Sequence, residues 1–154
     1  MPQDKKEVKI NFGIRKISVI DSSIETSKYK TDNKNPEFTF NFELGFRFDQ
    51  KTKEISFLLS FIVTPEKKPN LVVGKMKIEI MFFIKNMDDF LHPKEPKINL
   101  PDQFMSNLIG IVISTSRGLW ASKVMGTKLE NAILPILHPN EFLKGLKSRT
   151  KSGA

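Results

Sequence analysis

The stretch from Glu37 to Asp49, EFTFNFELGFRFD, alternates apolar and polar residues without interruption. Its even positions carry five phenylalanines and one leucine, whereas its odd positions carry polar residues or glycine. Because successive side chains of a strand point to opposite faces, the pattern predicts a strand with one aromatic face and one polar face. The aromatic face has to be covered, so the chain must build a sheet that is apolar on one side.

Three further segments have the composition and period of strands. They are VKINFGIRKISVI at residues 8–20, EISFLLSFIVT at residues 54–64 and LVVGKMKIEIMFFI at residues 71–84. In the first segment the alternation changes phase after Arg15 and Lys16, which is typical of a β-bulge. Residues 25–36 are polar and aperiodic and predict a loop, whereas DQKTK and PEKKPN predict turns. The sequence therefore predicts a four-stranded antiparallel sheet.

From Pro101 onward the period changes, and residues 101–126 predict a helix roughly 37 Å long that ends at Gly126. Its apolar residues do not fit one stripe, since Leu108 and Val112 lie on one side while Ile109 lies on another. A helix that is apolar on several sides must be buried on several sides. Since a chain of 154 residues has little left to cover the second side, we expect a two-fold seam between copies along this helix. The alternative is a kinked core helix within one copy.

After Gly126 the chain continues into an apolar run, Ala132 to Leu137, which Pro135 interrupts. Proline is costly inside a helix, so this run predicts an extended connector. The sequence PNEFLKGLK then begins a short second helix with Pro139 in its first turn. The expected fold class is α+β, with a single domain at residues 1–147 and a basic, disordered tail at residues 148–154.

The residues that carry most enzymatic chemistry do not gather in this sequence. There is no cysteine, and the two histidines, His92 and His138, stand in separate loops beside prolines, which argues against a metal site. The glycines form no phosphate-binding loop, and the serines have no nucleophile-elbow context. We therefore expect a protein that is not an enzyme and that needs no cofactor or metal.

The net charge of +8 is the other feature that bears on partners. The last twelve residues carry four basic side chains and no acidic one, which is half of the excess. The remaining lysines are scattered without interleaved aromatic residues, so nucleic acid is a disfavoured partner, and a basic nucleic-acid-binding module is kept only as an alternative. No stretch is apolar enough for a signal peptide or a membrane span, so we expect a cytoplasmic protein without membrane insertion.

Two stretches support a resemblance to a known family. The string ISTSRGLWASKVMGTKLENAILPILHPNEF, from Ile113 to Phe142, contains Gly126-Thr127 and a closing Pro-Asn-x-Phe, and the first strand contains IRKISVIDSSIE. With the order of the expected elements, these resemble the SecB family of export chaperones, specifically its divergent SecB-like branch, over roughly residues 8–147. The resemblance implies a SecB-like fold, in which a four-stranded antiparallel sheet packs on a long interface helix and a short C-terminal helix follows.

The resemblance also implies a function. It implies a cytoplasmic homotetramer, a dimer of dimers, that acts as an ATP-independent holdase and binds unfolded polypeptides in apolar grooves. In protein export and translocation the partner would be SecA; related SecB-like proteins instead protect the antitoxin of a toxin–antitoxin system. By this resemblance the client-binding groove would include Tyr29, Phe38, Phe48, Leu134, Ile136 and Leu137. We expect Phe38 and Phe48, at the strand ends, to line it rather than Phe42. For the connector residues, packing onto the sheet is an equal alternative.

Two further sets of residues follow. The seam between copies on the long helix would include Met105, Ile109, Gly110, Ile113, Ser116 and Trp120. The acidic patch that binds the motor SecA in the family would correspond to Asp21, Glu25 and Glu79. Lys75 and Lys77 lie beside Glu79, and the whole chain is basic, so the sequence departs from the acidic character of export members.

Overall fold

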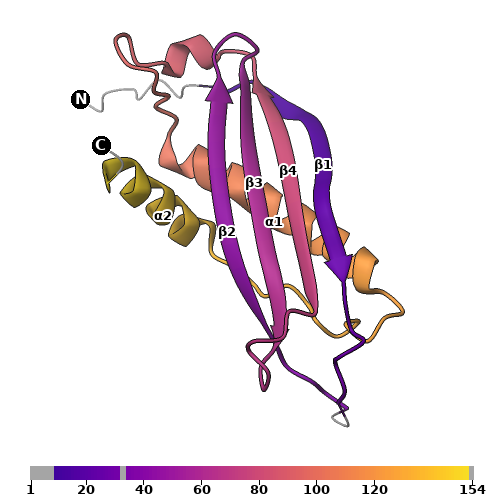
Figure 1. Cartoon of the computed structure of the whole chain (residues 1–154). Coiled ribbons are helices and arrows are strands. Elements are labelled where there is room, and N and C mark those ends of the chain that lie inside the picture. Colours follow the sequence, from indigo (N-terminus) through magenta and orange to yellow (C-terminus); the bar gives the residue numbers. More distant parts are fainter. Residues whose placement is uncertain (1–8, 32–33, 153–154) are drawn as a thin grey trace, which may run out of the picture.

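The computed structural model describes residues 9–31 and 34–152, and it shows one sheet and two α-helices (Figure 1). The strands are β1 (Phe12–Ile24), β2 (Phe38–Asp49), β3 (Glu54–Pro65) and β4 (Gly74–Ile84). They form an antiparallel sheet in the order β1-β4-β3-β2. A 3-10 helix η1 (Met87–Phe90) follows, and then come α1 (Asp102–Val124) and α2 (Pro139–Ser152). The predicted α+β fold, with four antiparallel strands, a long helix and a short C-terminal helix, is confirmed.

The strand pattern also predicted local features of the sheet correctly. Every even position of β2 pairs with an odd position of β3, from Phe38 opposite Pro65 to Phe48 opposite Ile55, so the aromatic face lies on one side. The expected irregularity in β1 occurs between Ile14 and Lys16, and a second register shift, which the sequence analysis missed, lies between Val19 and Asp21. β1 therefore carries more local twist than a regular strand.

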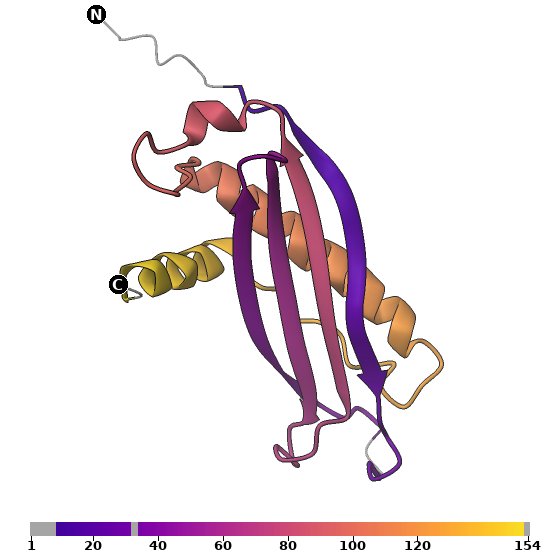
Figure 2. The ribbon, with the colours of Figure 1, turned by 45° about the horizontal axis from the view of Figure 1, so that its top comes forward.

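Helix α1 crosses the aromatic face of the sheet diagonally, and we call this side the inner face (Figures 1 and 2). Trp120 is fully buried at the crossing, with its ring edge-on to Phe40 and Phe61 at centroid distances of 6.3 and 5.3 Å. A Cβ atom at Gly74 would lie 2.6 Å from Cη2 of Trp120. The start of β4 can approach the helix this closely because Gly74 has no side chain.

Part of the side of α1 that faces away from the sheet is covered by the chain itself. The indole Nε1 of Trp120 donates a hydrogen bond of 2.8 Å to the carbonyl oxygen of Ala132 in the connector. One turn into α1, the hydroxyl of Ser106 donates to Oδ1 of Asn140 in α2. The connector and α2 therefore cover more of this helix than the sequence led us to expect, and Ser114 and Gly118 stay exposed.

The ends of the predicted elements differ modestly from the observed ones. Helix α2 continues to Ser152, so its backbone includes residues 148–152, which were assigned to the expected tail; Gly153 and Ala154 lie outside the described residues. The 3-10 helix η1 contains Asp88 and Asp89 in its first turn. In the part of the chain that the structure describes, no helix has the length and apolarity needed to cross a membrane.

Candidate functional site

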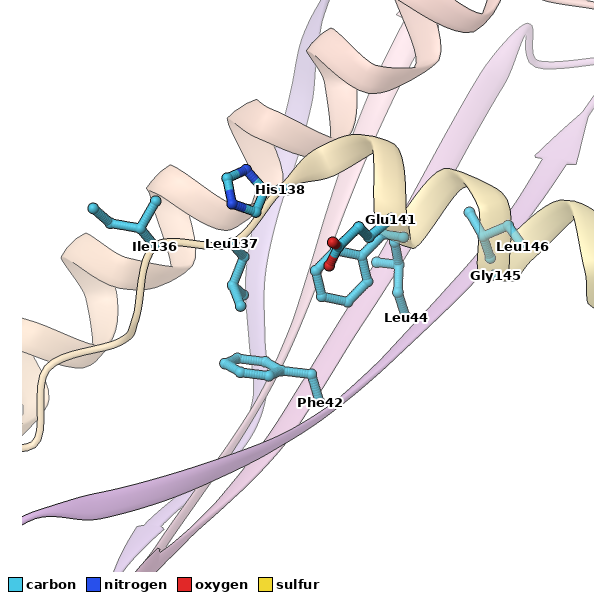
Figure 3. A pocket seen from close by; sticks show the side chains of 9 residues that line it. Phe42, Leu44, Ile136, Leu137, His138, Glu141, Gly145 and Leu146 are labelled. Carbon is cyan, nitrogen blue, oxygen red and sulfur yellow. The ribbon is translucent and has the colours of Figure 1, made fainter.

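Two adjoining cavities follow β2 along the inner side of the sheet, and together we call them the β2 groove. The first, of about 270 Å³, lies between β2, the end of the connector and α2 (Figure 3). The second, of about 440 Å³, lies between the start of β2 and the middle of the connector. The first is lined by Phe42, Leu44, Ile136, Leu137, His138, Glu141, Phe142, Gly145 and Leu146. The second is lined by Pro36, Glu37, Phe38, Thr39, Phe40, Glu66, Asn131, Ala132 and Ile133. Phenylalanines of β2 and aliphatic side chains of the connector thus meet in the groove, and the second cavity also contains the carboxyl groups of Glu37 and Glu66.

The connector between the two helices, residues 125–138, exposes some apolar side chains to water and buries others in the core. Leu129, Ala132 and Leu134 are buried in the core. Between and after them, Ile133 is 71% exposed and Ile136 is 85% exposed. An extended segment points alternate side chains to opposite sides, so Ile133 is directed outward by the same geometry that buries its neighbours. An exposed apolar row beside a groove is typical of a binding surface.

Side chains of α1 fix the position of the connector. The guanidinium of Arg117 donates through Nε to the carbonyl oxygen of Leu134, at 3.3 Å, and through Nη2 to that of Pro135, at 3.0 Å. The hydrogen bond from Trp120 to Ala132 lies just upstream. A planar guanidinium that holds two successive carbonyl groups restricts the orientation of the peptide units immediately before Ile136. The exposed isoleucine is thus carried on a restrained backbone.

Of the residues expected in the client-binding groove, the structure brings some together and places others elsewhere. Ile136 and Leu137 line the first cavity, and Phe38 lines the second. Tyr29 is buried and its ring contacts Phe38, and Leu134 is buried in the core with 2% of its surface exposed. For Leu134 the alternative of packing onto the core holds.

The aromatic residues of β2 contribute differently from the expectation. Phe42, at the centre of the strand, lines the first cavity together with Phe142 of α2, with ring centroids 6.3 Å apart. Phe48 lies at the other end of β2, where its ring contacts Phe46. Phe38 at one end of the strand and Phe42 at its centre both line the groove, whereas Phe48 lines neither cavity. Alternation shows which residues share a face, but the place where the connector returns to β2 is a long-range property of the fold.

The residues expected at the seam between copies are mostly part of the chain's own core. Met105, Ile109, Ile113, Ser116 and Trp120 are all buried within one copy. The sixth, Gly110, faces the ring of Pro139, which would lie 3.6 Å from a Cβ atom at that position. These side chains are already covered within one copy. Exposure of apolar residues therefore gives no reason to place the seam between copies on them.

An apolar surface of another kind lies on β1, at one edge of the sheet. Phe12, Ile14, Ile17 and Val19 pair with the inner-face residues of β4, yet they are 42–46% exposed. The diagonal course of α1 leaves much of this strand uncovered (Figure 2). Sequence reasoning missed this surface, because the apolar alternation of an edge strand is the same as that of a central strand.

The expected acidic patch is neutralised by basic neighbours. Asp21 forms an ion pair of 3.2 Å with Lys75, and Glu79 forms one of 3.1 Å with Arg47. Glu25 lies beyond the end of β1, where hydrogen bonds from the hydroxyl and the backbone N–H of Ser27 lower the pKa of its carboxyl. Paired carboxylates present little net negative potential to a partner.

Other titratable groups do not assemble into a centre. Among the residues that the structure describes, no three His, Asp or Glu side chains are placed to hold a metal ion. The pKa of Glu66 is raised by a hydrogen bond to the side chain of Glu37 and by the repulsion between the two carboxylates. Because this pair is exposed and its carboxyl groups repel each other when ionised, it makes the stability of the fold depend on pH.

Comparison with known proteins agrees with the fold. The solved structure of a SecB-like chaperone from Mycobacterium tuberculosis, in complex with a ChAD peptide from the HigA1 antitoxin, is similar with a TM-score of 0.56 and 12% identity, over 82% of this chain and 89% of that chain. A protein of unknown function from Streptococcus agalactiae has a TM-score of 0.34 and 14% identity, over 84% of this chain and 100% of that chain. No family model and no curated protein matches the sequence. The first similarity shows a SecB-like fold.

Proposed function

We propose that this protein is a chaperone that holds unfolded segments of other polypeptides in the β2 groove without using a nucleotide. The observation that carries the proposal is the connector, where Ile133 and Ile136 are held exposed beside a row of half-buried phenylalanines. Aromatic and aliphatic walls bind by shape and burial, so they suit clients of varied sequence. The similar SecB-like chaperone, which was solved with a peptide, supports the same reading.

Between the two roles of such chaperones, the structure favours a dedicated partner over protein export. The pairing of Asp21 with Lys75 and of Glu79 with Arg47 removes the acidic surface that SecA would need. The similar chaperone carries a peptide from an antitoxin. We therefore propose a client such as an aggregation-prone antitoxin, with export as the alternative. The cytoplasmic location stays a prediction.

We also propose that the protein assembles from several copies through β1 rather than through the buried residues of α1. A sheet edge with four half-exposed apolar side chains is suited to cover the same surface on a second copy. Ser114 and Gly118 on the exposed side of α1 would let another backbone approach closely. A dimer of dimers remains the expected assembly.

The test is suppression of aggregation of an unrelated denatured protein, followed by light scattering without nucleotide. We expect equimolar assembled chaperone to suppress scattering, and Ile136→Ser to weaken this effect severalfold because it removes the most exposed apolar side chain of the groove. Met125→Ser is the matched control, since Met125 is 72% exposed at the other end of the connector. No suppression at any ratio, or equal loss in both variants, contradicts the proposal.

A further inference from the structure

We propose that the β2 groove takes its client as an added strand, hydrogen-bonded through main-chain atoms to the free edge of β2 between Phe38 and Phe42. This inference rests on the proposed function and specifies how the client is bound. The occupant is an extended segment of another polypeptide with apolar side chains at every second position. Its main chain pairs with β2 while those side chains enter the two cavities.

The first step is to establish which backbone groups of β2 face the edge. Opposite residues of an antiparallel pair alternate between those that exchange hydrogen bonds and those that do not. The N–H of Glu66 donates to the carbonyl oxygen of Glu37 at 3.0 Å, and the register continues with Phe38 opposite Pro65 and Thr39 opposite Thr64. Odd residues of β2 therefore bond to β3, and even residues direct their N–H and C=O groups away from the sheet.

The second step is that these groups have no partner within the chain. β2 is the last strand of the sheet, and among the residues that the structure describes no hydrogen bond reaches the backbone of Phe38, Phe40 or Phe42. Leu44, farther along, makes an interaction of its own, so the proposed strand addition is confined to Phe38–Phe42. Three residues with outward N–H and C=O groups form a repeating array that is complementary to another extended backbone.

The third step is that the side chains of the same three residues line the groove. The side chains of Phe38 and Phe40 line the second cavity, and that of Phe42 lines the first. Along a strand, every second side chain lies on the same face at intervals of about 6.6 Å. An added strand would therefore place consecutive inward side chains against Phe38, Phe40 and Phe42, with Ile133 and Ile136 on their other side.

The polar side of this edge shows why such a site would accept many clients. The residues between the phenylalanines, Thr39 and Asn41, are exposed on the outer face and carry no charge. A client's outward side chains would lie beside these two uncharged residues, while the carboxyl groups of Glu37 and Glu66 at the start of the edge would favour a basic side chain there. Main-chain bonds supply affinity that is independent of sequence, and the cavities supply the preference for apolar residues.

The test uses a nine-residue peptide with phenylalanine or leucine at alternate positions and threonine or serine between them. Two further peptides carry N-methyl groups, either on the apolar residues alone or on the polar residues alone. Only alternate N–H groups of an added strand face β2, so we expect one methylated peptide to bind at least tenfold more weakly while the other binds within about threefold of the parent. Loss on methylating the apolar residues indicates antiparallel addition, and loss on methylating the polar residues indicates parallel addition.

A second measurement reports on the chaperone itself. Amide hydrogen exchange of Phe40 and Phe42 should slow at least tenfold when the unmethylated peptide binds, whereas that of Asn41, already bonded to β3, should change little. Binding with equal affinity for both methylated peptides and no added protection overturns the strand addition and leaves the chaperone function standing. Protection that grows with protein concentration in the absence of peptide overturns it in favour of a second copy. Failure of every peptide to bind, together with failure to suppress aggregation, counts against the proposed function itself.

Discussion

The hydroxyl of Ser116 is a polar group in the core with no hydrogen-bond partner among the described residues. An unsatisfied buried polar group costs free energy, and alanine is also the better helix former. We expect Ser116→Ala to raise the free energy of unfolding by about 1 kcal/mol, measured by urea denaturation. Ser106→Ala is the control, since that hydroxyl bonds to Asn140 and its loss should destabilise the protein. A destabilised Ser116→Ala variant would show that the hydroxyl has a partner.

The carboxyl pair Glu37 and Glu66 predicts a pH effect of definite sign. The pKa of Glu66 is raised above its ordinary value of 4.5, so the folded state holds this proton more tightly than the unfolded state does. The group's contribution to stability is therefore complete at low pH and is lost as the pH rises through the raised pKa. We expect Glu66→Gln to increase the melting temperature at pH 7 and to have no effect near pH 4, measured by thermal unfolding. An increase of equal size at both values would contradict repulsion as the cause.

At the scale of elements, the sequence predicted the features that depend on neighbouring residues and missed those that depend on long-range contacts. The strands were predictable because their faces are set by neighbouring residues: the alternation from Phe38 to Phe48 is local information. The covering of α1 was not predictable in this way, since it depends on where residues 125–138 return, which is set by Trp120 and Arg117 from the preceding helix. The same limit applied to the site: the resemblance implied both Leu134 and Ile136, but only Ile136 is exposed, whereas Leu134 is buried.

The connector offers an element-scale prediction through Arg117. Removing its two hydrogen bonds to the carbonyl oxygens of Leu134 and Pro135 should free the backbone that carries Ile136. We expect Arg117→Gln to accelerate amide hydrogen exchange in residues 133–137 at least tenfold and to weaken client binding, with a smaller effect on the melting temperature. Lys128→Gln is the control, because that side chain bonds to Tyr29 at the other end of the connector, at 3.4 Å. Unchanged exchange in the first variant would show that Arg117 does not hold the groove.

At the scale of the whole molecule, β1 determines the expected assembly. Ile17 and Val19 are 45–46% exposed, so replacing both with lysine should leave a single copy folded while it places charges between copies. We expect Ile17→Lys/Val19→Lys to reduce the particle mass to that of one chain in sedimentation, with an unchanged circular dichroism spectrum. Val72→Lys is the control, since Val72 is 43% exposed outside the strands. An unchanged mass for the double variant would place the contact between copies elsewhere.

The two register shifts of β1 have a consequence for how far such a sheet can grow. A regular strand at the rim of a sheet can template another of its kind, and the process repeats without limit into a fibril. The extra residues at Arg15 and Ile20 interrupt the ladder twice within one strand, so a regular incoming strand finds no continuous match. β1 thereby limits fibril growth from its edge of the sheet, a property that the proposed chaperone function would require.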